Sequence, residues 1–235
     1  MKVVFVGPSL PDATDMPDIQ IRPPACQGDV MQAVLDGATA IGLIDGQFEF
    51  VAPVWHKELL FALSKGIGVL GAASMGALRA AECSAFGMVG VGRIYEDYAN
   101  GHRDDDGDVA LLHGPAELSY IPLTVPMVNV DATLAHAEEL ELLSAAERQH
   151  ISQAARCVFF KDRNWAVIAK TAGCDVQRLR SIVKQAWVDQ KRLDALQLIE
   201  AIRVPAAPKP AKTWTFNEIS VWRNLFPSDE GERKP

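Results

Sequence analysis

Apolar residues along the first ninety positions follow two alternating periods. Runs rich in β-branched residues predict strands at residues 2–6, 40–44 and 68–70. Apolar residues recur at helical spacing in residues 28–36, in residues 53–64, and from a small-residue turn at 71–76 to about residue 86. Pro53 is expected in the first turn of its helix, and Gly66 just beyond its end. This alternation predicts an α/β fold with a small parallel-sheet core and crossover helices.

The pattern changes after the predicted sheet. We expect an α/β core at residues 1–130, followed by a helical C-terminal region at 131–203 packed on that core. Residues 204–235 comprise a Pro-rich linker and a tail in which aromatic residues recur between positions 214 and 226. Such a tail either docks on its own domain or binds another chain.

Composition narrows the possible partners. The chain has 235 residues, of which 49% are apolar and 23% charged, so one main domain is expected. A net charge of −7 argues against nucleic acid as a partner, because binding it needs clustered basic residues.

No apolar run is long enough to span a membrane, and we expect a cytoplasmic protein. The cysteines and histidines lack ligand-like spacing, so no metal is predicted. No phosphate-binding loop is present, and no cofactor is predicted.

Three loops are expected to meet at one edge of the sheet, because ligands gather where parallel strands end. These loops are Gly7 to Ser9, Asp45-Gly46, and the turn at 71–76. Asp45 could orient a catalytic base, or the Asp-Gly pair could only make a turn. Gly7 and Ser9 are therefore predicted to lie near a substrate.

The turn at residues 71–76 contains the best candidate for chemistry. Ser74 lies where a strand gives way to a helix, and such a turn can expose a serine hydroxyl as a nucleophile. The alternative is that Ser74 is an N-cap, whose hydroxyl accepts a backbone N–H. An active serine needs a base, which His56 or Lys57 could supply. Lys57 would have to be neutral and turned inward, and the alternative is a solvated surface amine.

Three motifs, taken together, resemble those of the TfuA-like family. They are Asp45-Gly46-x-Phe48, Pro53-x-x-His56-Lys57-Glu58, and the stretch Gly-Ala-Ala-Ser-Met-Gly-Ala-Leu-Arg-Ala-Ala-Glu at residues 71–82. Residues 5–10 and 108–115 are also similar, so the resemblance covers about residues 1–130. The helical remainder and the aromatic tail carry no motif of the family.

The resemblance implies a function. TfuA-like proteins accompany YcaO enzymes, which use ATP to activate a peptide amide for replacement of its oxygen by sulfide, a post-translational modification. The family is associated with a hydrolase-like Ser-Lys pair that cleaves a thiocarboxylated ThiS-like carrier protein. By position Ser74 and Lys57 match the pair, with Lys65 as a second candidate base. Backbone N–H groups around Met75 and Gly76 would hold the oxyanion.

Several charged residues have two interpretations. Arg79 and Glu82 can form a helix-face ion pair or dock a partner, and five residues of separation turn Arg79 away from Ser74. Arg103 and Asp104 begin an acidic loop, predicted to be solvated or partner-facing rather than a calcium site, because its spacing departs from the EF-hand pattern.

Two other functions fit the same residues. The protein could be a non-catalytic adaptor that docks the YcaO enzyme to its peptide, with Ser74 only a helix cap. It could instead be a free-standing Ser-Lys amidase or esterase acting on small molecules. Release of sulfide from a thiocarboxylated carrier discriminates among the three.

Overall fold

One parallel sheet organises the molecule. The computed structural model describes residues 1–47, 49–204 and 214–226. Within them, five strands pair in parallel in the order β2-β1-β3-β4-β5. The strands are β1 (Lys2–Phe5), β2 (Ile19–Arg22), β3 (Ala40–Leu43), β4 (Gly68–Ala72) and β5 (Val89–Val91). The predicted α/β class is confirmed, and the three predicted strands are β1, β3 and β4.

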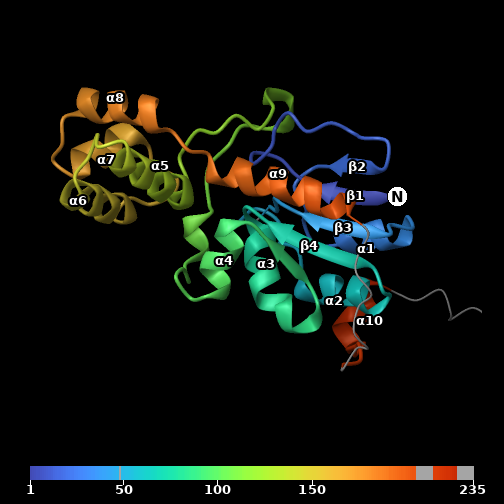
Figure 1. The fold of residues 1–235 in the computed structure, drawn as a ribbon. Helices are drawn as coiled ribbons and strands as arrows, with labels where there is room; N and C mark the ends of the chain where they lie inside the picture. Colours follow the sequence, from blue (N-terminus) through green and yellow to red (C-terminus); the bar gives the residue numbers. More distant parts are fainter. Residues whose placement is uncertain (48, 205–213, 227–235) are drawn as a thin grey trace, which may run out of the picture.

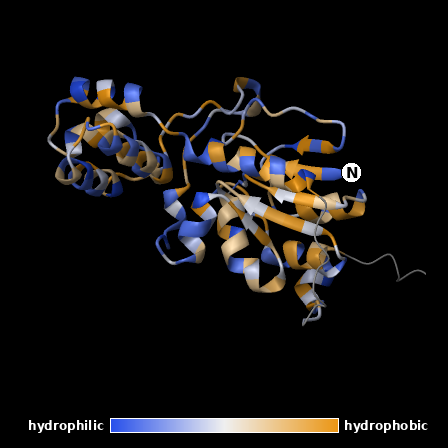
Figure 2. Ribbon diagram, in the orientation of Figure 1, coloured by the Kyte–Doolittle hydropathy of each residue, from blue (hydrophilic) through white to orange (hydrophobic). Residues whose placement is uncertain are grey.

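Three helices cover one face of the sheet, packed on apolar side chains such as Val3, Ile41 and Val69. They are α1 (Asp29–Leu35), α2 (His56–Ser64) and α3 (Met75–Cys83), and each follows a strand as the sequence predicts. Figure 2 shows the apolar strands at the centre of this core. Pro53 is not in the first turn of α2, because it pairs with Cys26 in an isolated bridge and the helix begins three residues later.

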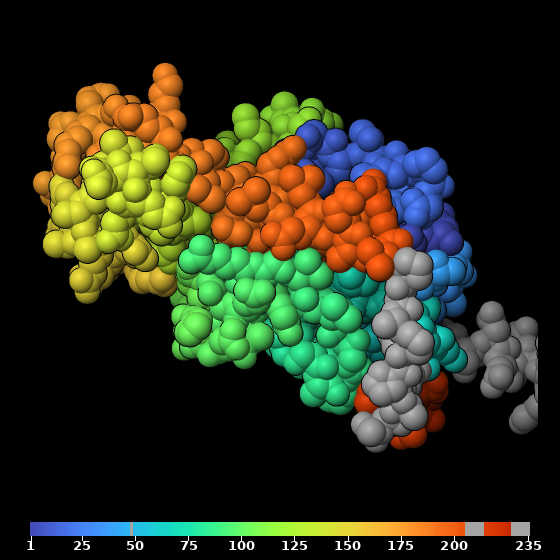
Figure 3. All heavy atoms as spheres, viewed as in Figure 1, coloured from blue at the N-terminus to red at the C-terminus, as the bar shows by residue number. Residues whose placement is uncertain are grey.

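The opposite face is covered by a helix from the far end of the chain. Helix α9 (Gln190–Arg203) places Ala195, Leu198 and Ile202 against Val4 and Ala72 of the sheet. Figure 3 shows α9, in orange, as a band across the core. The segment between β1 and β2 contains no helix, so α9 fills the layer that a β1–β2 crossover helix would occupy.

The remaining helices form a lobe beside the sheet (Figure 1). Helix α4 (Arg93–Ala99) leads toward the lobe. The lobe has an apolar core of its own, which includes Leu134, Ile151, Ile168 and Leu179. Its helices are α5 (Met127–Glu139), α6 (Ala145–Arg156), α7 (Trp165–Thr171) and α8 (Val176–Ala186). The region predicted to be helical therefore divides into this lobe and α9. No helix in the described residues is long and apolar enough to cross a membrane.

Charged side chains connect the lobe to the core. Arg103 donates to Asp108 at 2.6 Å and to Asp131 at 2.8 Å, while Arg156 pairs with the same two carboxylates at 3.3 and 2.8 Å. Asp108 is buried and Arg103 is mostly covered, at 6% and 10% side-chain exposure. Because paired charges of this kind are costly to separate, the network fixes the base of the lobe.

The aromatic tail docks on its own domain, the first of its two predicted alternatives. Helix α10 (Ser220–Leu225) buries Trp222 against α2, with the Trp222 and Phe61 ring centroids 5.1 Å apart. Trp214 donates its indole N–H to the Phe86 carbonyl at 3.2 Å. The linker expected at residues 205–212 lies outside the described residues.

Candidate active site

The ends of β1 and β3 are joined by a buried carboxylate. Asp45 accepts hydrogen bonds from the backbone N–H groups of Gly7 and Ser9, both at 2.9 Å, and from the Ser9 hydroxyl at 2.7 Å. The strand order reverses between β1 and β3, and such switch points form ligand-binding crevices in parallel sheets. Asp45 contacts neither His56 nor Lys57, so it orients the β1 loop and not the predicted bases.

The turn that contains Ser74 packs directly against the backbone at the end of β3. A Cβ on Gly76 would lie 1.7 Å from the Leu43 carbonyl oxygen, and one on Gly71 would lie 2.1 Å from the Gly76 oxygen. Only glycine fits at either position. The Gly76 N–H donates to the Ile44 carbonyl at 3.1 Å, which holds the start of α3 against the end of β3. The three predicted loops therefore meet.

Ser74 occupies a strained turn. The residue before it, Ala73, has a φ of 64° in the left-handed region, which is uncommon without a glycine. Ser74 stands at the N-cap position of α3, yet its side chain makes no capping hydrogen bond. Its hydroxyl also bonds no other group in the described part of the chain, so the N-cap alternative accounts for its position but not for its oxygen.

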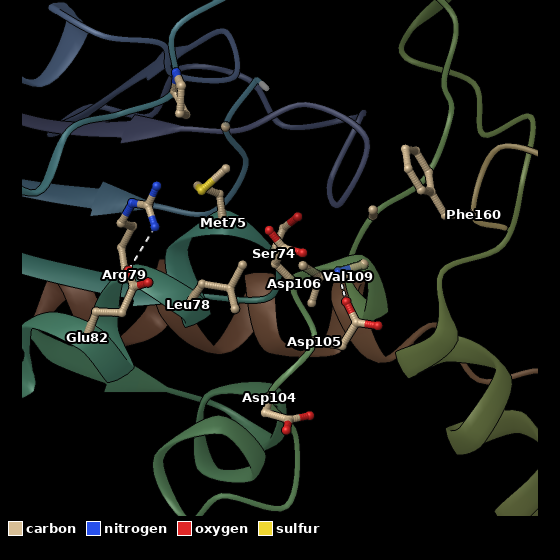
Figure 4. Close-up of a pocket in the computed structure, with 14 residues that line it drawn as sticks. Ser74, Met75, Leu78, Arg79, Glu82, Asp104, Asp105, Asp106, Val109 and Phe160 are labelled. Carbon is tan, nitrogen blue, oxygen red and sulfur yellow. Dashed lines mark hydrogen bonds and ion pairs between the residues drawn. The ribbon is translucent and has the colours of Figure 1, made fainter. Parts of the chain in front are cut away.

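Ser74 lines a cavity of about 460 Å³ at the carboxyl edge of the sheet (Figure 4). Helix α3 supplies one wall, with Met75, Leu78, Arg79 and Glu82. The facing wall consists of residues 104–107, Val109, Ala110 and Phe160. The volume lies within the range of small-molecule sites, roughly 300–1,000 Å³.

Arg79 reaches this cavity, although sequence spacing predicted that it would face away from Ser74. Its long side chain extends along α3 and pairs with Glu82 at 2.8 Å, the predicted ion pair, and its Nε donates to the Val54 carbonyl at 3.1 Å. His56 contacts the same Glu82 carboxylate at 2.7 Å. Burial raises the pKa of Glu82, but the hydrogen bonds from His56 and Arg79 outweigh it, and the pKa is lowered overall.

Neither lysine proposed from sequence lines the cavity. The Lys57 amine donates to the Asn217 carbonyl in the tail and lies 4.8 Å from the Phe216 ring centroid. Lys65 stands at the other end of α2, with its amine 5.0 Å from the Phe61 ring centroid. The structure therefore does not bring Ser74 together with either of them.

Of the two predicted oxyanion donors, one is available and the other is not. The Gly76 N–H is engaged with Ile44, so it is not free to hold a developing negative charge, which corrects the prediction for this residue. The Met75 N–H, in the first turn of α3, forms no hydrogen bond with the described residues. Met75 is the remaining donor, at the positive end of the helix.

The acidic loop is part of the site. Asp104, Asp105 and Asp106 line the cavity, and the Asp105 carboxylate caps the Gly107 N–H at 2.8 Å. Arg103 was predicted to be a surface docking residue, and this prediction is wrong. Its guanidinium forms internal ion pairs with Asp97, Asp108 and Asp131.

A lysine that the sequence analysis did not select lies beside the site. Lys191 on α9 is 2% exposed, and its Nζ donates to the Val109 carbonyl at 3.0 Å. Burial lowers its pKa, against the opposing effects of Asp45 and Asp189. A sequence signal exists, because Lys191 precedes Ala195 by four residues and so falls on the apolar stripe of α9.

The fold and the cavity define an α/β protein with a serine at the carboxyl edge of a parallel sheet, and the hydroxyl of this serine bonds none of the described residues. A family model described as TfuA-like protein matches residues 45–164, more than half of the chain. The chain belongs to the TfuA-like family, and this membership supports a place in a YcaO-associated thioamidation system. No curated protein matches the sequence.

Proposed function

We propose that the protein is a hydrolase that releases sulfide from a thiocarboxylated ThiS-like carrier, for thioamidation of a peptide by a YcaO enzyme. Family membership supports the YcaO context. The observation that carries the hydrolytic step is the Ser74 hydroxyl, which lines the cavity beside a strained residue and is not used to cap α3. A strained strand-to-helix turn of this kind is how hydrolases expose a nucleophile.

The reaction proceeds in two halves. Ser74 Oγ attacks the thiocarboxylate carbon while a base takes its proton, and a C–O bond forms. The tetrahedral intermediate collapses with cleavage of the C–S bond, and the sulfur leaves as hydrosulfide (HS⁻), which carries the proton from the base. Water then attacks the serine ester, and the carrier departs with an ordinary carboxylate. The net reaction is hydrolysis, with no oxidant or reductant.

The walls of the cavity suit the end of an extended chain. Leu78, Val109 and Phe160 offer apolar contact within the cavity that Ser74 lines. Arg79 supplies the single positive charge among the described residues that line the cavity; its charge is paired with Glu82, and the guanidinium N–H groups not used by Glu82 or Val54 can donate to the carrier terminus. The Met75 N–H is available at the start of α3 for the oxyanion, a contribution worth about 10²–10³ in rate.

The test is sulfide release from purified thiocarboxylated carrier, measured by thiol-reactive fluorescence. The wild type should release sulfide without the YcaO enzyme, and Ser74→Ala should be slower by several orders of magnitude. Ser84→Ala is the matched control, because Ser84 lies at the other end of α3 and, within the described ranges, its hydroxyl bonds the Ala81 carbonyl alone. This control should retain the wild-type rate.

Two results contradict the proposal. A wild-type protein that releases no sulfide while supporting thioamidation by the YcaO enzyme would be an adaptor. A protein that hydrolyses simple activated esters but ignores the carrier would be a small-molecule hydrolase. Mass spectrometry of wild-type protein quenched during turnover should also reveal carrier esterified to the peptide that contains Ser74.

A further inference from the structure

The cavity that Ser74 lines has a surplus of negative charge. Among the described residues, four carboxylates and one guanidinium line it, those of Glu82, Asp104, Asp105, Asp106 and Arg79. Arg79 and Glu82 form an ion pair at 2.8 Å on α3, so the surplus comes from the loop at residues 104–106. This loop is the wall that faces α3 (Figure 4). One wall of the cavity is therefore close to neutral and the other is negative.

One carboxylate of the loop has partners within the protein. Asp105 accepts the Gly107 N–H at 2.8 Å. It also lies near Arg163, because burial lowers the pKa of Arg163 and the neighbouring carboxylates, Asp105 among them, oppose this effect. Arg163 does not line the cavity, and its Nε donates to the Ala155 carbonyl of the lobe at 3.2 Å. The charge of Asp105 thus serves the loop and the lobe.

The side chains of Asp104 and Asp106 differ from that of Asp105. Within the described ranges neither carboxylate forms a hydrogen bond or an ion pair, and both residues are exposed while they line the cavity. On the α3 side, Ser74 is only 9% exposed and its hydroxyl bonds none of the described residues. A ligand that fills the cavity displaces water from these groups, so it must offer polar partners on both sides.

The proposed substrate does not match the negative wall by its terminus alone. A thiocarboxylate is an anion at neutral pH, and it reaches Ser74 between α3 and the acidic loop. Like charges a few ångströms apart repel, and more strongly where protein excludes water. Arg79 offsets only part of this repulsion, because its charge is paired with Glu82. A substrate that suits the cavity therefore brings positive charge of its own.

We infer that Asp104 and Asp106 bind a lysine or arginine side chain in the C-terminal segment of the carrier, a few residues before its thiocarboxylate. The inference rests on the proposed function, because it assumes that the carrier terminus enters this cavity. The ammonium or guanidinium donates charge-assisted hydrogen bonds to the two carboxylates. The acidic loop then recognises a carrier tail that holds both signs of charge, which specifies the partner for the partner-facing alternative predicted for this loop.

The experiment measures KM and kcat for sulfide release with two forms of purified thiocarboxylated ThiS-like carrier. One form keeps the basic residues of its C-terminal segment, and the other has glutamine in their place. With the basic carrier, Asp104→Asn/Asp106→Asn should raise KM by about threefold to tenfold with little change in kcat, because each partly solvated ion pair contributes up to about fivefold. With the neutral carrier, the same variant should lower KM, because it removes only repulsion of the anionic terminus.

The matched control is Glu139→Gln/Glu141→Gln, which removes the same amount of negative charge from the lobe. Both glutamates are exposed and neither lines the cavity, so KM should stay within about twofold of wild type with either carrier. The effects of the Asp104→Asn/Asp106→Asn variant should shrink in about 1 M salt, where the screening length falls to about 3 Å. A structural role of the two aspartates would not reverse the sign of the KM change between carriers.

Three results would overturn the inference. The first is a KM in Asp104→Asn/Asp106→Asn that equals the wild-type KM or changes in the same direction with both carriers. The second is a KM effect that needs added Mg²⁺ and disappears with a chelator, which would assign the carboxylates to a metal ion. If the variant does not fold, wild-type protein alone decides, because a neutral carrier with a KM as low as that of the basic one is the third contrary result.

Binding to Ser74→Ala separates this inference from the hydrolase proposal, because the variant should hold the carrier without releasing sulfide. The Kd of fluorescently labelled carrier for Ser74→Ala should rise by about threefold to tenfold when the basic residues are changed to glutamine. If the wild type releases no sulfide but this preference persists, the hydrolase proposal fails and the charge recognition stands. If sulfide is released with no preference between the carriers, the hydrolase proposal stands and the charge recognition fails.

Discussion

Lys191 Nζ and Asp45 Oδ1 lie 3.9 Å apart, with both side chains 3% exposed. The pair joins α9 to the end of β3, two elements separated by more than a hundred residues. It also joins the layers of the fold, because α9 covers the face of the sheet opposite to α1, α2 and α3. The helix that completes the core thus places a buried titratable group beside Asp45.

Replacing Asp45 by asparagine should lower the pKa of Lys191 further below its ordinary range, which titration of its ¹⁵N-labelled Nζ by NMR measures. Without the facing negative charge, the ammonium form of Lys191 is less stable, and a nearby opposite charge shifts a pKa by about one to three units. The asparagine oxygen can still accept from Gly7 and Ser9, and its amide can donate to the Ser9 hydroxyl. Asp12→Asn, which removes an exposed partner of Arg192, should leave the midpoint unchanged.

Replacing Lys191 by methionine should change how stability depends on pH. Burial holds the pKa of Lys191 in the folded chain below its ordinary value of 10.5. At pH values between the folded pKa and the ordinary one, the unfolded chain binds a proton that the folded chain does not. The wild-type free energy of unfolding should therefore gain up to about 1.4 kcal/mol per pH unit in that window from this group. Urea unfolding at several pH values should show this contribution absent in Lys191→Met. The exposed-site control Lys184→Met should retain it.

The main layers of the fold were predictable because their sequences carry a clear period. Strands β1 and β3 are apolar runs closed by Gly7 and by Asp45-Gly46, and the helices between strands show regular apolar spacing. Strands β2 and β5 were missed because Ile19–Arg22 alternates with polar residues and Val89–Val91 is too short to show a period. Whether a distant helix covers the second face depends on tertiary packing, which local pattern does not encode.

The candidate site was predictable only where turn chemistry marks it. Ser74 and Asp45 stand at glycine-containing turns after strands, so they could be placed at one edge of the sheet. Lys57 was selected because its position matches the Ser-Lys pair of the TfuA-like family, but the aromatic tail binds its amine. Lys191 gives the opposite case, because its place on the apolar stripe of α9 indicates burial, but only the packing of α9 on the sheet shows what the amine contacts.

Gly76→Ala should destabilise the protein by about 3 kcal/mol or more, the upper end of the cost of overpacking. The new methyl carbon would lie 1.7 Å from the Leu43 carbonyl oxygen. This backbone belongs to a central strand of the sheet, so it cannot move away. Gly68→Ala is the matched control, because its Cβ would meet only the Ala40 Cβ, at 3.9 Å. Denaturant unfolding of the two variants measures the difference, and equal stabilities would show that the crossing of α3 and β3 is looser than described.

Trp222→Ala should release the C-terminal tail from α2. The indole is 2% exposed and its ring lies 6.1 Å from the Trp55 ring and 5.0 Å from the Phe216 ring, so truncation removes the centre of the aromatic cluster. Loss of a buried tryptophan costs about 3–5 kcal/mol in a core. Here the tail can undock instead, so the global stability falls by no more than the docking free energy.

Limited trypsin digestion tests this release, because the exposed Arg223 lies in the docked helix and becomes a substrate when the helix unfolds. Cleavage should accelerate by at least about tenfold in Trp222→Ala, since 1.4 kcal/mol of lost docking already corresponds to that factor. Val221→Ala is the control, because Val221 is 52% exposed on the same helix. If the two variants are cleaved at the same rate, contacts other than Trp222 hold the tail, and the Lys57 amine stays bound to it.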